Sequence, residues 1–191
     1  KYTAENAGKT ISGLAAGDRG QAVEGLKNVG KVAAVATLAI GAFDLLNGPD
    51  AVSAETINDD LAGGKHPETG VPFEEKEVEL SDKTITGTFP VFESGYDVSL
   101  PDHLYTASND AQFNYANHAL YGEIQQNPSL AKELGLSEGE IANLANGETP
   151  DGYTWHHHEE PGKLQLVDRE VHAQTGHTGG QHLWAGGSEN R

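Results

Sequence analysis

The residues from 153 to 180, YTWHHHEEPGKLQLVDREVHAQTGHTGG, contain five of the nine histidines of the chain, and three of these five are adjacent. The first residues favour a strand, EPGK at 160–163 predicts a tight turn, and LQLV at 164–167 predicts a returning strand. Asp168 is a good N-cap for a helix that ends at Gly176. We therefore predict a strand, a turn, a second strand and a helix within about 25 residues.

The strand pattern predicts where the adjacent histidines point. Alternation along an extended strand puts Trp155 and His157 on one face, and His156 and His158 on the other. The three adjacent histidines are therefore divided between two faces of the predicted hairpin.

The two later histidines complete a pattern that is typical of a divalent-metal site. His172 lies on the predicted helix, and His177 follows just past its end. Neutral imidazole binds zinc and similar ions, and three protein ligands leave a coordination position open for chemistry. The glycines of GHTGG at 176–180 permit the loop that presents His177.

Composition limits the other possibilities. The chain has no cysteine, which excludes disulfides and thiolate metal ligands. Its formal net charge is −17, although residues 1–50 carry five acids and five bases. Such a charge repels nucleic acid at long range and favours a partner with a basic face. A cleft that holds a cation and histidines can still be locally positive, but Lys163 and Arg169 are the only bases near the histidine segment.

The N-terminal part differs from the rest. Residues 32–46, VAAVATLAIGAFDLL, are mainly apolar but fall short of the roughly 20 residues that span a bilayer. We expect a buried or partner-facing helix, and a transient membrane contact during delivery stays open. The absence of methionine leads us to expect a piece of a longer protein. A turn-rich stretch at 62–73 suggests a boundary between a helical segment, 1–62, and a domain over 63–191.

The first part of the second domain predicts a mixture of strands and helices. EEKEVEL and KTITGTFPVF suggest short strands. Residues 108–128 predict a helix that Ser108 or Asn109 can cap, and further helices follow near 129–135 and over 137–146. Together with the histidine segment, this pattern predicts an α+β fold class with a C-terminal ββα unit, whose core covers 153–184.

The remaining aromatic and histidine residues are less informative. We expect Trp184 to fill the core of the small ββα unit rather than to stack on bases. His118 lies off the apolar stripe of the helix over 108–128, so we expect it to be a surface or structural histidine. His66 and His103 show no metal spacing and are expected to be structural.

These residues resemble a known family. TWHHHEEPGKLQLVDREVHAQTGHTGG is similar to the WHH-type branch of the HNH nuclease superfamily, also called ββα-metal or His-Me finger nucleases. Three other stretches are similar to segments of bacterial toxin modules that contain this motif, namely FPVFESGYDVSLPDHLY, FNYANHALYGEI and TPDGYTW. The resemblance covers residues 65–184 and is most specific over 153–180. Modules of this kind form the C-terminal ends of nuclease colicins, contact-dependent inhibition proteins and other polymorphic toxins.

The resemblance implies roles for individual residues. In the family's first strand, a metal ligand precedes the general base, and these positions fall on His156 and His157. The helix histidines that complete the metal site fall on His172 and His177. The family's middle residue is usually an asparagine that orients the base, and its best match here is Gln165. The implied cofactor is one divalent ion, which could be Zn²⁺, Mg²⁺, Mn²⁺ or Ni²⁺.

A second register remains open. Some relatives place a proline four residues after the metal ligand, and that rule applied to Pro161 makes His157 the ligand and His158 the base. We prefer His156 and His157, because Trp155 anchors the match.

The resemblance implies a metal-dependent endonuclease, with DNA favoured over RNA, that forms the toxic C-terminal domain of a secreted or injected bacterial protein. It would act as a monomer in the cytoplasm of a target cell, and its producer would need a cognate immunity protein. Two other hypotheses stay open. The histidines could form a structural metal site in an interaction module, or the N-terminal half could be a delivery segment that acts on membranes.

Overall fold

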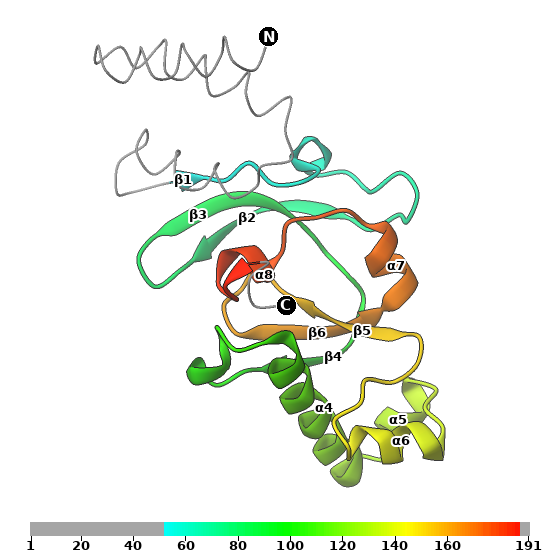
Figure 1. The fold of residues 1–191 in the computed structure, drawn as a ribbon. Coiled ribbons are helices and arrows are strands. Elements are labelled where there is room, and N and C mark those ends of the chain that lie inside the picture. The colour runs from blue at the N-terminus through cyan, green and yellow to red at the C-terminus, as the bar shows by residue number, and fades with distance from the viewer. Residues whose placement is uncertain (1–51, 188–191) are drawn as a thin grey trace, which may run out of the picture. The chain divides into compact units, whose positions relative to one another are not determined.

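The computed structural model describes residues 52–187, so the helix predicted over 32–46 lies outside the described residues. The chain divides into two units, Lys1–Glu55 and Thr56–Arg191. Within the described part, the first unit holds only the short strand β1 (Val52–Ser53). The second unit contains the histidine segment, and Figure 1 shows its strands and helices.

The second unit begins with a hairpin that has both buried apolar and exposed acidic side chains. After a 3-10 turn, η1 (Asp59–Leu61), strands β2 (Phe73–Glu79) and β3 (Thr84–Pro90) pair antiparallel, with Phe73 opposite Pro90. Apolar side chains from these strands are buried, whereas the glutamates of β2 are exposed, and this burial does not follow a strict alternation along either strand. The buried apolar set is Phe73, Val78, Ile85 and Phe89.

The histidine segment forms the predicted hairpin within a three-stranded sheet. Strands β5 (Tyr153–His157) and β6 (Lys163–Asp168) pair antiparallel, as predicted. The sequence did not indicate the third strand, β4 (Ser94–Ser99), which pairs with the other side of β6. The strand order β4-β6-β5 leaves β5 at an edge of this sheet.

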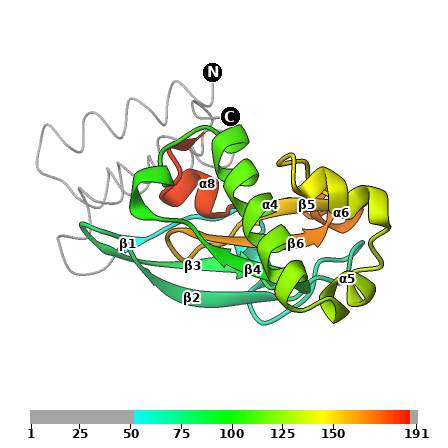
Figure 2. The same cartoon turned by 90° about the horizontal axis from the view of Figure 1, so that it is seen from below.

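Helices follow where the sequence predicted them. A short 3-10 turn, η2 (Asp102–Leu104), leads to α4 (Asn109–Gln126), α5 (Ser129–Glu133) and α6 (Glu138–Leu144). The Ser108 hydroxyl accepts from the backbone N–H of Ala111 at 3.3 Å, which confirms Ser108 as the N-cap of α4. Figure 2 shows α4 lying across the β4-β6-β5 sheet.

The sheet is covered on both faces. On the α4 side, Ala116 and Leu120 are fully buried in one apolar cluster with Trp155, Leu164 and Leu166 of the hairpin. On the opposite side, Val167 packs with apolar residues that precede β4, namely Val71, Phe73 and Phe92. Side chains of β5 and β6 therefore face two different environments, and this division positions the site.

The chain ends on two short helices, α7 (Arg169–Gln174) and α8 (Gly180–Leu183). The Asp168 carboxylate accepts from the backbone N–H of Val171 at 2.8 Å, so the predicted N-cap is confirmed. Trp184 packs against the main apolar cluster, as expected of a core residue. His118 is exposed, which agrees with a surface histidine.

Taken together, the described residues form an α+β fold with a ββα arrangement near the C-terminus, as predicted. A search of the same residues for a helix of sufficient length and hydropathy to cross a bilayer found none.

Candidate metal centre

Three histidines from three different elements meet at one point. His156 comes from the edge strand β5, His172 from α7, and His177 from the loop before α8. One potential ligand atom from each ring lies within 4.8 Å of the other two. Nδ1 of His156 is 3.3 Å from Nε2 of His172. The structure thus brings together the three residues predicted as metal ligands.

Burial keeps these imidazoles in the form that binds metal. Burial, and then the neighbouring imidazoles, hold the pKa of His156 well below its ordinary value. Burial and then the charge of His177 lower the pKa of His172 to about 4. Burial also lowers the pKa of His177. At neutral pH all three rings are therefore uncharged, and a neutral ring has a lone pair available for a cation.

A backbone carbonyl selects one nitrogen of His177 for coordination. Nδ1 of this ring lies 2.7 Å from the carbonyl oxygen of Thr175. Because a carbonyl only accepts, Nδ1 must carry the proton, and the lone pair of the neutral ring is then on Nε2. Metal-ligating histidines commonly donate their other N–H in this way, which fixes both the tautomer and the direction of the ring.

The donor set fits a small divalent ion. Two ligands at the usual zinc–nitrogen bond length around a tetrahedral ion are about 3.3 Å apart. The pair formed by His156 and His172 has this separation. The nitrogen of His156 in this pair is Nδ1, and Nε2 of the same ring is buried without a hydrogen-bond partner among the described residues.

An aromatic side chain supports all three rings. Phe92, in the loop between β3 and β4, has its ring centroid 4.8 Å from that of His156, 5.3 Å from His172 and 5.2 Å from His177. Phe92 itself is only 7% exposed. The histidines therefore pack on a buried apolar surface, which limits their rotamers and excludes water from that side.

Two glycines allow the loop after His177 to approach β5. A Cβ on Gly179 would lie 2.9 Å from the carbonyl oxygen of His157 and 3.2 Å from a ring carbon of His156. A Cβ on Gly180 would lie 2.1 Å from the carbonyl oxygen of His158. The sequence predicted these glycines for their backbone freedom. At these two positions the structure shows another reason, because the backbone comes so close to the His157 and His158 carbonyls that a side chain would not fit.

His157 points to the other face of β5 but borders the same pocket. Its cross-strand partner is Leu164, which belongs to the cluster on the α4 side. A pocket of about 300 Å³ is lined by all four histidines in question and by residues of α4 and the C-terminal segment. The four are His156, His157, His172 and His177. Both faces of β5 can border one pocket because β5 is an edge strand.

The ring of His157 meets a glutamine of α4. Its Nε2 lies 2.5 Å from Oε1 of Gln112, and the Gln112 side chain is fully buried. The amide nitrogen of Gln112 donates to the carbonyl oxygens of Leu104 and Tyr105, at 2.7 and 2.8 Å. Gln112 was not predicted as a site residue. It lies 45 residues before His157, and a single sequence gives no sign that two such distant positions are in contact.

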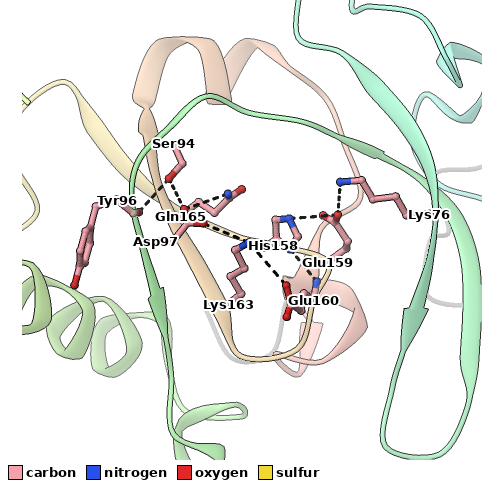
Figure 3. A network of polar contacts seen from close by, with 9 residues as sticks. All are labelled: Lys76, Ser94, Tyr96, Asp97, His158, Glu159, Glu160, Lys163 and Gln165. Atoms are coloured by element: carbon pink, nitrogen blue, oxygen red, sulfur yellow. Dashed lines mark hydrogen bonds and ion pairs between the residues drawn. The ribbon is translucent and has the colours of Figure 1, made fainter.

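Gln165 takes part in a different network. It lies directly across from His156 on β6, and its amide nitrogen donates to Asp97 of β4 at 3.2 Å. Figure 3 shows this contact together with those of Ser94 and Lys163 to the same carboxylate. The orienting role of Gln165 at His157 stays a prediction, and Gln112 is a second amide that contacts the ring.

His158 is engaged on the side away from the pocket. Its Nε2 lies 3.3 Å from the Glu159 carboxylate, which also pairs with Lys76 of β2 at 2.7 Å. Figure 3 shows these contacts linking the β2–β3 hairpin to the turn after β5. His158 is not among the residues that line the pocket. Glu159 is buried whereas Lys76 is partly exposed, so a partly buried ion pair holds this turn.

Comparisons with known proteins give one result. Searches of the curated proteins and of the solved structures found no match. A family model described as the DNase/tRNase domain of colicin-like bacteriocins matches residues 81–179. This range is just over half of the chain, and it includes the three clustered histidines and His157. The chain therefore belongs to the family of DNase/tRNase domains of colicin-like bacteriocins.

Proposed function

We propose that the part of the chain from residue 63 onward is a metal-dependent endonuclease of the WHH-type branch of the HNH superfamily. The observation that carries the proposal is the convergence of His156, His172 and His177, with His157 bordering the same pocket. The family description supports nuclease activity. This arrangement also favours His156 over the alternative register, because His158 lies outside the pocket.

Each residue has a distinct task in this proposal. His156, His172 and His177 would hold one divalent ion, which when bound would stabilise the charge that develops on the phosphate. His157 takes the proton from a water molecule as the water oxygen attacks phosphorus. The bond between phosphorus and one sugar oxygen breaks, its electron pair leaves with that oxygen, and a proton from solvent converts the oxygen to a hydroxyl group. The buried aromatic support under the ligands keeps water from reaching them from the Phe92 side.

We propose DNA as the substrate. RNA can be cleaved through its own 2′-hydroxyl, whereas DNA has no internal nucleophile and needs an external water molecule. A base beside a metal centre supplies what the attack of water requires. The family description covers DNases and tRNases, so both substrates belong in the test.

The biological setting follows from the same family. We propose that the domain is the toxic part of a secreted or injected bacterial protein, that it acts in the cytoplasm of a target cell, and that the producer makes a neutralising immunity protein. The family is described as a domain of colicin-like bacteriocins, which supports this setting.

The test is cleavage of supercoiled plasmid and of total RNA by the chain, made by cell-free synthesis, with Mg²⁺, Mn²⁺, Zn²⁺ or Ni²⁺. We expect metal-dependent nicking of the plasmid, its loss in His157→Ala, and its retention in His118→Ala, which changes an exposed histidine of α4. Loss in His158→Ala with retention in His157→Ala would instead support the second register. Metal binding without cleavage of either substrate would favour a structural metal site.

A further inference from the structure

We propose that Gln112 positions the imidazole of His157 and thereby fixes which of its nitrogens is basic. The inference rests on the proposed function, since positioning matters if His157 accepts a proton. Its starting point is the contact between Nε2 of His157 and Oε1 of Gln112, at 2.5 Å. Gln112 lies on α4, whereas the other proposed site residues come from the β5–β6 hairpin, α7 and the loop before α8.

The direction of this hydrogen bond follows from the partners of Gln112. Its amide nitrogen lies within hydrogen-bond distance of two backbone carbonyl oxygens, those of Leu104 and Tyr105. Carbonyl oxygens only accept, so the NH₂ end of the amide must face them and the oxygen end must face His157. The ring therefore donates from Nε2. A neutral imidazole has one N–H, so the lone pair that can take a proton is on Nδ1.

The surroundings keep this arrangement rigid. Gln112 is fully buried and both ends of its amide are used at once, so a rotated amide would lose the hydrogen bonds to the Leu104 and Tyr105 carbonyls and turn its NH₂ group toward His157. The His157 ring also lies between two aromatic side chains, with centroids 5.5 Å from Phe113 and 5.5 Å from Trp184. A side chain held in one rotamer costs no reorganisation at the moment of reaction.

The same helix offers a matched control. One and a half turns further along α4, the buried amide of Asn117 donates to the carbonyl oxygen of Gly147 and accepts from Nε1 of Trp155, at 2.7 and 2.8 Å. Asn117 therefore contacts the indole of Trp155 in the same way that Gln112 contacts the imidazole of His157, and both rings come from β5. Indole has no basic nitrogen, so only Gln112 can affect proton transfer.

The first experiment reads the tautomer directly. In the metal-free full chain, labelled with ¹⁵N in histidine, two-bond proton–nitrogen correlations report which ring nitrogen carries the proton. We expect the Nε2–H tautomer at His157 in the unchanged protein and in Asn117→Leu, and a mixture of tautomers in Gln112→Leu. An Nδ1–H tautomer at His157 in the unchanged protein would overturn the inference, even if Gln112→Leu fails to fold.

The second experiment reads the reaction. Gln112→Leu should lower kcat for plasmid nicking by about 10- to 100-fold, the usual effect of losing such a partner, with KM unchanged. Asn117→Leu should lower stability but not kcat. In a His157→Ala background Gln112→Leu should have no further effect, because the glutamine acts through the missing ring. Additive losses, or a larger loss in Gln165→Leu than in Gln112→Leu, would contradict the inference.

The two experiments separate this inference from the proposed function. If the unchanged protein cleaves neither DNA nor RNA, the proposed function is wrong, and the tautomer alone then decides whether Gln112 fixes the ring. If the unchanged protein cleaves DNA and Gln112→Leu cleaves equally well, the proposed function stands and Gln112 has no positioning role.

Discussion

At the scale of single residues, the proposed metal centre requires three rings that come from different elements. His172 comes from α7, and its Nε2 lies 3.3 Å from Nδ1 of His156. Removing His172 would leave two imidazoles, one fewer than the three protein ligands of a typical catalytic zinc site.

Loss of a residue that only hydrogen-bonds to a metal ligand weakens metal binding by roughly 10- to 100-fold. We therefore predict that His172→Ala, which removes a proposed ligand itself, weakens Zn²⁺ binding by more than that. Isothermal titration calorimetry measures this directly. His118→Ala serves as the comparison, because His118 is exposed on α4. Equal affinities in the two variants would show that His172 is not a ligand.

A second residue-scale prediction concerns Asp97, where opposing effects set the pKa. Burial of Asp97 acts to raise its pKa, but hydrogen bonds from Ser94 and Gln165 and the charge of Lys163 together lower the pKa below 3.8. A carboxyl with a lowered folded pKa stabilises the protein above the unfolded value, and this contribution is lost as pH falls through the folded pKa.

Asp97→Asn should therefore reduce the free energy of unfolding at pH 7. The difference from the unchanged protein should shrink as the pH falls below 3.8. Urea unfolding at a series of pH values between neutral and acid measures this difference. A difference that stays constant down to pH 3 would mean that the charge of Asp97 contributes nothing to stability.

At the scale of elements, the segment that contains α8 is held against the end of β5 by a close backbone approach and by the side chain of Trp184. A Cβ on Gly180 would lie 2.1 Å from the carbonyl oxygen of His158 and 2.3 Å from Nε1 of Trp184. Trp184 donates from that nitrogen to the same carbonyl at 2.9 Å. The added carbon would separate the loop from the strand and break this hydrogen bond.

We predict that Gly180→Ala costs about 1–3 kcal/mol of stability, as overpacking in a tight interior does. Gly122→Ala on α4 is the matched substitution. A Cβ there meets nothing within 4 Å, so alanine should stabilise the helix by roughly 0.5–1 kcal/mol. Denaturant unfolding should give opposite signs for the two variants, and a loss of similar size in both would contradict the close-approach argument.

The elements also show what the sequence can predict. The local patterns around Ser108, Asp168 and the hairpin were sufficient, because caps and alternation act over a few residues. The pairing of β4 with β6 and the contact of Gln112 with His157 were not predicted. These contacts join residues 45 or more positions apart, and a single sequence records no such pairing. The contacts of Phe92 with the three histidine rings were not predicted for the same reason.

At the scale of the whole molecule, charge sets how the chain can approach DNA. The net charge of −17 repels phosphate. Of the bases near the histidine segment, Lys76 and Lys163 are paired with carboxylates, whereas Arg169 at the start of α7 is exposed. Side chains of this region would therefore neutralise few phosphates, and each neutralised phosphate contributes to the salt dependence of binding.

We predict that the affinity of His157→Ala for duplex DNA falls by about tenfold between 50 and 200 mM salt, as expected for about two neutralised phosphates. A protein with 6–10 such contacts loses about 10³- to 10⁵-fold over the same range. Fluorescence anisotropy with a labelled duplex measures the slope. A steep slope would reveal a basic surface that the described residues do not account for.

The hydrogen bonds from α4 to β5 define the piece of this protein that recombination could exchange intact. A transferred fragment that starts at Tyr153 would carry all five histidines that line the pocket but neither Gln112 nor Asn117. The protein that receives the fragment would then have to supply amide groups at matching positions. Otherwise Trp155 and His157 would lose these hydrogen-bond partners. Gene shuffling among relatives should therefore find its productive crossover points before residue 109, not at the start of the hairpin.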